Sequence, residues 1–145
     1  MDQINKWDKR FLELAKLVST WSKDPSTGIG AVITNNKNRI ISLGFNGYPH
    51  GIKDEGLENR EEKLYRIIHA EQNALAFAFR SVEGCTLYCT HCPCSQCASM
   101  IIQREIKKVV FPKKIEQVFT ERWQHQINIS LELFKESGII VKQIS

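Results

Sequence analysis

Two short motifs hold the side chains with the clearest potential for chemistry. One has the form His69-x-Glu71 and the other the form Pro93-Cys94-x-x-Cys97. One imidazole and two thiolates are zinc ligands, and zinc held by only three protein groups keeps a fourth position for water, as catalytic sites do. The remaining carboxylate can carry protons. The motifs therefore predict a hydrolytic zinc site, with His69, Cys94 and Cys97 as ligands and Glu71 as the acid–base residue.

The cysteine-rich segment also contains a competing arrangement. The pairs Cys89/Cys92 and Cys94/Cys97 are two C-x-x-C steps that could hold a closed zinc site or an iron–sulfur cluster. Only Pro93 separates the two steps. Two-knuckle zinc sites need a loop of roughly 15 to 20 residues so that the knuckles can face each other. The spacing therefore favours the three-ligand site.

Length and composition limit the class of protein. A chain of 145 residues with 42% hydrophobic content is expected to form one domain, residues 1–145. The net charge of +4 contains no dense basic block, so nucleic acid is not an expected partner. The amino terminus lacks the apolar core of a signal peptide, and no apolar run is long enough to span a bilayer. We therefore expect a soluble, cytoplasmic protein without a membrane partner.

Periodicity and turn residues predict the elements that must position the motifs. Apolar residues at three- and four-residue spacing predict an opening helix from Ile4 to Trp21, and the turn Asn35–Asn38 separates two strands of a hairpin. A loop covers residues 46–58, and the chain ends in a strand after Ser137-Gly138. The predicted ranges are strands 30–34, 39–45, 86–90, 108–111 and 139–144, and helices 4–21, 69–80, 94–104 and 115–136. They predict a three-layer α/β/α sandwich around a mixed sheet of about five strands.

The spacing within each motif restricts how the ligands can converge. Cys94 and Cys97 lie three residues apart and share one face of a helix. A helix N-terminus also lowers a thiol pKa, which favours thiolate ligands there. His69 and Glu71 lie two residues apart and would diverge in the middle of a helix. We therefore expect two helix N-termini to face one zinc ion.

The complete pattern matches a known signature. A His-x-Glu motif followed about two dozen residues later by Pro-Cys-x-x-Cys, with a strand between two helices, is the signature of zinc deaminases. In that chemistry Glu71 takes a proton from zinc-activated water, the oxygen attacks an amino-bearing ring carbon, and ammonia leaves.

Further segments resemble one family within this group, the deoxycytidylate deaminases. The resemblance covers roughly residues 23–111 and rests on the segments Ser22–Ile33, Gly44–Gly51, His69–Leu75, Thr86–Tyr88 and Ile101–Gln103. It implies a cytidine-deaminase-like fold and conversion of dCMP to dUMP, which would supply thymidylate synthesis. It also implies a homo-oligomer, often a hexamer, that dCTP activates and dTTP inhibits. Mg²⁺ would accompany such a triphosphate.

The same resemblance suggests how the nucleotide is bound. Asn46 would hydrogen-bond the deoxyribose, although this chain has Phe45 where the family has tyrosine and so lacks that hydroxyl. The loop also resembles the family's effector-binding loop, which makes Asn46 and Gly47 candidate effector contacts. An ordinary Asn-Gly turn is the alternative explanation.

Lys23, Ser26, Thr27 and Arg80 are candidate phosphate ligands, although each could equally be a solvated surface residue. On a helix over 69–80, Arg80 would share a face with His69 about 16 Å further along the axis. The helix is apolar all round, so Arg80 is expected at or near a subunit interface.

Two other functions fit the motifs less well. A deaminase of tRNA adenosine would need a continuous basic surface around its pocket. The stretch before the first motif instead contains several acidic residues: Asp54, Glu55, Glu58, Glu61 and Glu62. A deaminase that uses the same chemistry on a free base is a further alternative. A non-enzymatic zinc module that binds nucleic acid would leave Glu71 without a role.

Overall fold

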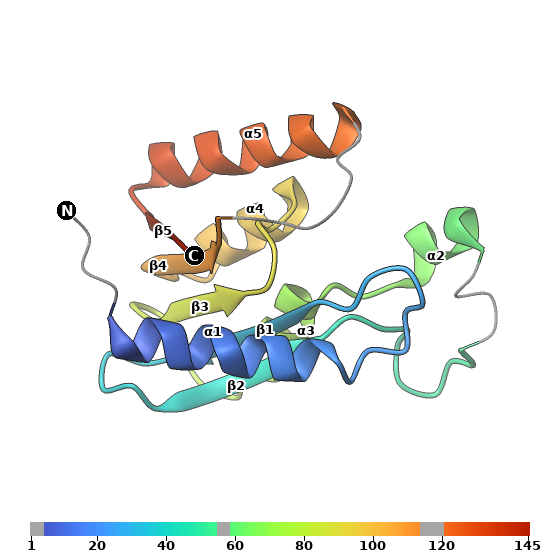
Figure 1. Cartoon of the computed structure of the whole chain (residues 1–145), viewed down its shortest axis with the longest axis horizontal. Coiled ribbons are helices and arrows are strands. Elements are labelled where there is room, and N and C mark those ends of the chain that lie inside the picture. Colours follow the sequence, from blue (N-terminus) through green and yellow to red (C-terminus); the bar gives the residue numbers. More distant parts are fainter. Residues whose placement is uncertain (1–4, 55–58, 114–120) are drawn as a thin grey trace.

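The computed structural model describes residues 5–54, 59–113 and 121–145. Its centre is a five-stranded sheet in the order β2-β1-β3-β4-β5 (Figure 1). The strands are β1 (Gly30–Thr34), β2 (Ile40–Phe45), β3 (Thr86–Cys89), β4 (Lys108–Pro112) and β5 (Ile140–Ile144). β1 runs antiparallel to β2 and β3, whereas β3, β4 and β5 are parallel. The predicted mixed sheet of about five strands is thus confirmed.

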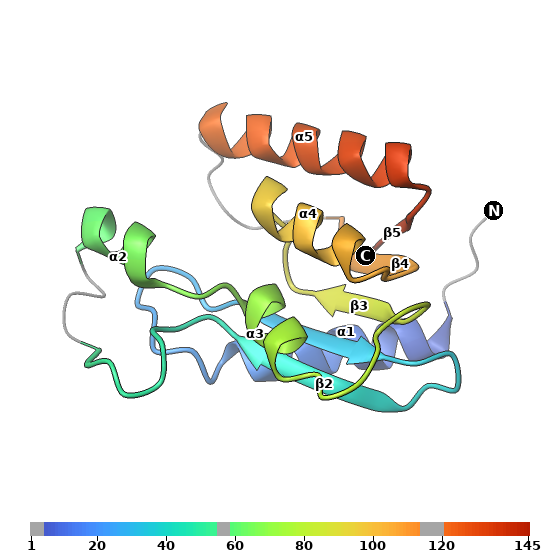
Figure 2. The ribbon, with the colours of Figure 1, turned by 180° about the vertical axis from the view of Figure 1, so that it is seen from behind.

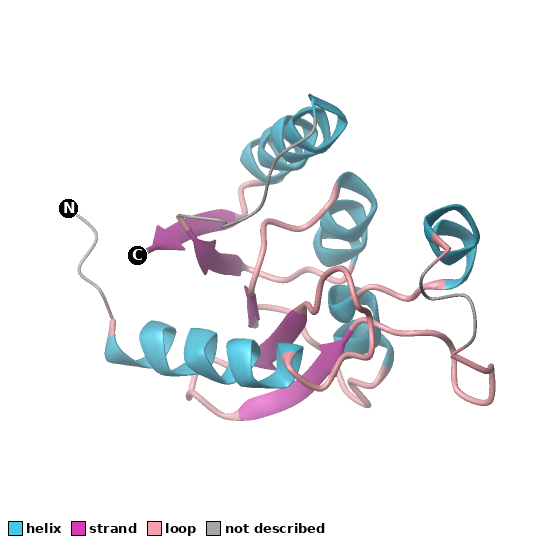
Figure 3. Cartoon of the chain, turned by 45° about the vertical axis from the view of Figure 1, so that its right-hand side comes forward, coloured by secondary structure: helices cyan, strands magenta, loops and turns pink. Residues whose placement is uncertain are grey.

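Helices cover both faces of this sheet. α1 (Lys6–Ser19) packs on one face, where Phe11 and Ala15 share a buried cluster with Val32 and Tyr88. α3 (Ala70–Ala76), α4 (Ser95–Gln103) and α5 (Glu121–Ser137) lie on the opposite face (Figures 2 and 3). A short helix, α2 (Arg60–Arg66), precedes α3. The three layers match the predicted sandwich.

Two glycines let helices approach the strands closely. A Cβ on Gly44 would lie 2.6 Å from both the Ala70 carbonyl oxygen and the Ala74 nitrogen of α3. A Cβ on Gly30 would lie 2.0 Å from the Ala15 carbonyl oxygen of α1. Only a residue without a side chain fits such contacts. The first of these glycines seats α3, and with it His69, directly against β2.

Several predicted boundaries are wrong. The helix predicted over 69–80 ends at Ala76, so Arg80 does not lie on it. Phe77 has left helical geometry, and Phe77 and Phe79 expose most of their surface instead of packing a further helical turn against the sheet. The first helix ends at Ser19 rather than at Trp21, whose ring instead meets Phe45 edge-on. The helix predicted over 115–136 is described from Glu121 onward, and positions 115–120 lie outside the described residues.

A buried carboxylate fastens α1 to the sheet. Asp8 is 1% exposed and accepts a hydrogen bond of 2.7 Å from the Tyr88 hydroxyl. The ammonium groups of Lys108 and Lys142 lie 3.0 and 2.8 Å from its Oδ2. Burial would raise the pKa of Asp8, but the bonds from Lys142, Tyr88 and Lys108 outweigh it and hold the pKa below its ordinary value of 3.8. The folded state therefore favours the charged carboxylate.

Replacing this carboxylate should destabilise the protein. We expect Asp8→Ala to cost about 3 kcal/mol of unfolding free energy, because it leaves two partly buried ammonium groups without their partner. Because the folded pKa is depressed, the contribution is present above the unfolded value near 3.8 and is lost as pH falls through the folded pKa. Urea unfolding at pH 7 and at about pH 3 measures both effects. Glu13→Ala, on the exposed side of the same helix, is the control; an equal loss in both variants at pH 7 would contradict the assignment.

Among the described residues, no helix is both long and apolar enough to cross a membrane.

Candidate metal centre and substrate cavity

The three predicted ligands converge. One potential ligand atom from each of His69, Cys94 and Cys97 lies within 4.8 Å of the others. His69 Nδ1 is 3.2 Å from Cys97 Sγ and 3.4 Å from Cys94 Sγ. Zinc–sulfur and zinc–nitrogen bonds of about 2.3 and 2.0 Å place tetrahedral ligands about 3.5 Å apart. The donor set and its spacing thus fit zinc.

Two helix starts produce this convergence, as the spacing predicted. His69 is the residue immediately before α3, and its backbone N–H donates to Gln72 Oε1 at 2.8 Å. Cys94 holds the same position before α4, and its carbonyl accepts from the Ala98 N–H at 2.8 Å. His69 and Glu71 therefore both lie at the start of α3, where their side chains can face the same site.

The three ligands influence one another's protonation. A hydrogen bond from Cys97 lowers the pKa of Cys94 to about 4, against the opposing effect of burial. The same bond raises the pKa of Cys97. Hydrogen bonding to Cys94 raises the pKa of His69. The cluster thus favours at least one thiolate facing the imidazole, which is the form that binds a metal ion.

Glu71 is buried next to this cluster. It is 3% exposed, and its Oε1 has no hydrogen-bond partner among the described residues. Burial raises the pKa of the Glu71 carboxyl. The neighbouring Cys89 thiol is also buried, which raises its pKa and keeps it protonated. A buried carboxyl with a vacant oxygen can accept and return a proton.

A cavity of about 660 Å³ opens beside the cluster. This volume lies in the usual range for small-molecule sites. Its walls come from the loop before β1, the end of β2, α2, the two motifs and α5. The N-terminal ends of α4 and α5 lie on the same side of the molecule as α2 (Figure 1). The lining residues are Asp24, Ser26, Thr27, Ile29, Asn46, Lys63, Leu64, Ile67, His69, Glu71, His91, Cys92, Cys94, Arg122, Trp123 and Gln126.

Sequence reasoning did not find part of this lining. Lys63 comes from α2, and Arg122, Trp123 and Gln126 come from α5. None of them belongs to a motif, and polar residues on a helix are usually solvated surface. Their only signal is the i, i+4 spacing of Arg122 and Gln126, which is common in any exposed helix.

Asn46 lines the cavity, and its side chain is hydrogen-bonded to the protein. It is 5% exposed, accepts a hydrogen bond from the Ile29 N–H at 2.8 Å and donates to the Thr27 carbonyl at 2.9 Å. Its Nδ2 also lies 3.4 Å from Asp24 Oδ2. Asn46 therefore fixes the loop that forms one wall of the cavity.

The other predicted nucleotide contacts are spread over the molecule. Ser26 and Thr27 line the cavity, whereas Lys23 is not among its lining residues and pairs with Asp54 at 2.8 Å on the exposed surface. Gly47 forms an antiparallel bridge with Ile68, the residue before His69.

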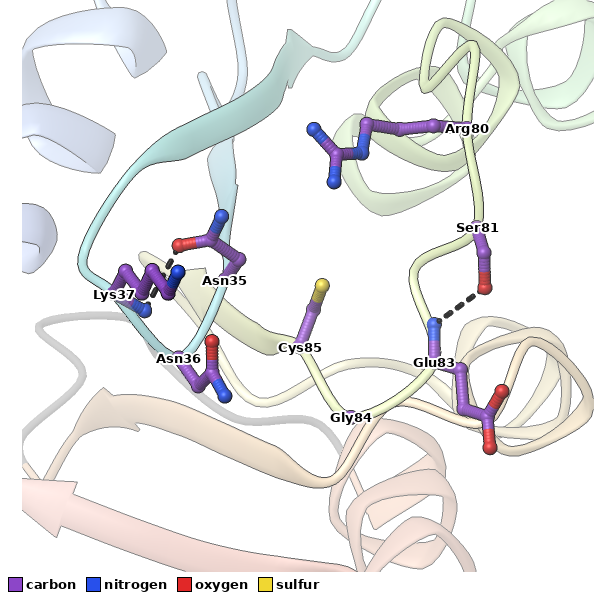
Figure 4. Close-up of a pocket in the computed structure, with 8 residues that line it drawn as sticks. All are labelled: Asn35, Asn36, Lys37, Arg80, Ser81, Glu83, Gly84 and Cys85. Atoms are coloured by element: carbon purple, nitrogen blue, oxygen red, sulfur yellow. Dashed lines mark hydrogen bonds between the residues drawn. The ribbon is translucent and has the colours of Figure 1, made fainter.

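Arg80 belongs to a second cavity of about 420 Å³. Lys37 of the hairpin turn and the Cys85 thiol lie across from its guanidinium, while the Glu83 carboxylate points elsewhere (Figure 4). None of the residues lining this cavity lines the one beside the metal cluster. The expectation that Arg80 and His69 share a helix face is therefore wrong.

Comparison with known proteins identifies the class. Residues 5–113 match the family described as the cytidine and deoxycytidylate deaminase zinc-binding region. The chain therefore belongs to this family of deaminases.

Its relatives narrow the comparison. It is 50% identical over 139 residues to an uncharacterized deaminase from the luxG 3′ region of Aliivibrio fischeri, covering 95% of this chain and 93% of that protein. It is 39% identical over 118 residues to the deoxycytidylate deaminase of Mus musculus, covering 76% of this chain and 66% of the mouse protein. The chain thus spans a little under two thirds of the mouse protein.

A solved structure agrees with these sequence relatives. The dCMP deaminase of the cyanophage S-TIM5, in complex with dCMP and dUMP, superposes with a TM-score of 0.75 at 28% identity. The match covers 99% of this chain and 100% of the phage protein. The fold prediction from the family resemblance is thereby confirmed.

Proposed function

We propose that the protein catalyses the hydrolytic deamination of dCMP to dUMP and ammonia. The observation that carries the proposal is the vacant Oε1 of buried Glu71, which lies beside a His/Cys/Cys cluster at the wall of a cavity large enough for a nucleotide. The relatives named deoxycytidylate deaminase and the dCMP- and dUMP-bound phage enzyme support dCMP as the substrate.

The residues of the two motifs divide the chemistry. His69, Cys94 and Cys97 would hold zinc, and zinc would supply the Lewis acidity that makes the attacking water easier to deprotonate. Glu71 takes a proton from the attacking water and passes it to ring nitrogen N3. After the oxygen has added to C4, Glu71 takes the second proton from that oxygen and delivers it to the amino group, which leaves as ammonia. Burial raises the pKa of the Glu71 carboxyl, which suits a group that must take up and release a proton twice.

Asn46, Ser26 and Thr27 are proposed to contact the substrate from the loop side of the cavity. Asn46 can do so through the remaining lone pair of its amide oxygen while it also fixes the loop. Lys23 remains a candidate only if its exposed pair with Asp54 opens. Exposed pairs of this kind contribute little stability, so the rearrangement would cost little.

Asn46→Ala should weaken both the loop and substrate binding. Loss of the amide leaves the Ile29 N–H and the Thr27 carbonyl without this partner, at a cost of about 1 to 3 kcal/mol in unfolding free energy. We expect the KM for dCMP to rise about tenfold, since one cavity wall loses its anchor. Urea unfolding and steady-state kinetics measure these effects. The control is Asn36→Ala on the exposed hairpin turn, and an unchanged KM in Asn46→Ala would remove Asn46 from the site.

We further propose that dCTP activates and dTTP inhibits the enzyme, with Mg²⁺ bound to the triphosphate. The support is the loop resemblance together with the bridge between Gly47 and Ile68, because a ligand on that loop would act on the residue next to His69. Arg80 is proposed as a second effector or interface contact.

A homo-hexamer is also proposed. Phe77, Phe79 and Met100 expose 60%, 93% and 47% of their surface, which favours a covering subunit. A cytoplasmic location and the supply of dUMP for thymidylate synthesis complete the proposal. Analytical ultracentrifugation tests the assembly directly.

The decisive experiment is ammonia release from dCMP by zinc-loaded protein, with and without dCTP or dTTP. Turnover that responds to both triphosphates would support the complete proposal. Turnover without any response would restrict it to catalysis. Failure on dCMP together with turnover of cytidine, guanine or tRNA would replace the substrate.

A further inference from the structure

Part of the cavity wall lies beyond the segment that the family model matches. That segment ends at residue 113, whereas Arg122, Trp123 and Gln126 of α5 line the cavity. The family motifs account for the metal cluster and the proton carrier. The α5 wall lies outside these motifs, so its residues can determine which substrate is bound while the motifs carry out the chemistry.

α5 is firmly seated next to the metal motif. Ile127 and Phe134 are buried in the main core cluster, and Trp123 packs against that cluster. The buried Ser130 hydroxyl donates a hydrogen bond of 2.8 Å to the carbonyl oxygen of Pro93, the residue before Cys94. The position of α5 relative to the metal ligands is thus set by packing and by a direct bond.

Two cationic side chains on the cavity wall differ in their surroundings. The Lys63 ammonium lies 3.2 Å from Asp24 Oδ1, and the two side chains are 13% and 3% exposed. Its charge is therefore already balanced. The guanidinium of Arg122 has no ion pair with any residue that the structure describes, and Arg122 is exposed.

Arg122 lies in the first described turn of α5 and lines the cavity. Its guanidinium would attract a bound anion. Gln126, one turn later on the same side, adds a neutral amide donor to the cavity.

We propose that Arg122 binds the 5′-phosphate of the substrate and makes α5 the element that selects a nucleotide over a nucleoside. This inference rests on the proposed deamination of dCMP. A guanidinium offers a planar pair of donors that matches phosphate oxygens, so a bidentate contact is expected. Lys63 stays on Asp24 and supports the loop wall rather than the phosphate.

The test compares substrates with and without the phosphate. Arg122→Ala should lower kcat/KM for dCMP about 10- to 100-fold, as expected for a lost charge-assisted contact. The low rate on deoxycytidine should change less than about twofold, because that substrate has no phosphate to lose. Arg122→Lys should restore part of the loss. Arg39→Ala, which removes an equal charge from the exposed hairpin, should behave as wild type.

Binding of the product gives a readout independent of turnover. By calorimetry, Arg122→Ala should weaken dUMP about 10- to 100-fold and leave deoxyuridine unchanged. Equal losses for the nucleotide and the nucleoside, or unchanged dUMP affinity, would overturn the role of Arg122 while the proposed activity stands. Wild-type protein that neither turns over dCMP nor binds dUMP would instead refute the proposed function itself.

Discussion

Glu71→Gln is expected to reduce dCMP turnover by about 10² to 10⁴-fold, the usual contribution of a positioned acid–base group. The amide has nearly the same shape as the carboxyl but cannot accept and return a proton. Because the shape is kept and Glu71 is not one of the proposed zinc ligands, the variant should fold and keep its zinc. Ammonia release measures the rate, and elemental analysis measures the zinc content.

The matched control is Glu83→Gln, which changes the same functional group on an exposed loop. Its rate should equal that of the wild type. Turnover by Glu71→Gln within about tenfold of wild type, at full zinc occupancy, would show that another group carries the proton. Loss of zinc in this variant would instead show that the carboxylate helps to hold the metal.

Cys97→Ala should remove both the metal and the activity. Cys97 is fully buried, and its sulfur faces His69 Nδ1 at 3.2 Å. With one of three protein ligands gone, we expect zinc content close to zero after dialysis and turnover at background. Wild-type protein in zinc 1,000-fold above its Kd should gain about 4 kcal/mol of stability over the chelated form. Cys97→Ala should show no such gain.

Cys85→Ala is the control for this experiment because Cys85 is also a buried thiol but lines the second cavity. It should keep zinc and activity and lose only packing energy. Equal zinc content in the wild type and in Cys97→Ala would contradict the assignment of Cys97 as a ligand. Retained zinc in Cys97→Ala with lost activity would indicate that a different residue completes the site.

Some elements were predictable because their signals are local. The hairpin strands follow from apolar runs on both sides of Asn35–Asn38, and the end of α5 follows from Gly138, which has a φ of +79°. The length of α3 was not predictable in this way. Apolar residues continue through Phe79, so the periodicity extends the helix, yet Phe77 and Phe79 are exposed in the structure. α3 therefore ends where the chain leaves the sheet, and not where the apolar pattern ends.

By itself the sequence determined the chemistry of the centre. Residue type and spacing within each motif are local properties, and they are enough to propose His69, Cys94 and Cys97 as ligands and Glu71 as the proton carrier. Only the tertiary structure decided what surrounds them. The wall formed by Arg122 joins the site through the packing of α5 and its bond from Ser130 to Pro93, between residues far apart in the chain. Such contacts depend on how each helix packs against the sheet, and this packing cannot be predicted from the spacing of residues within a motif.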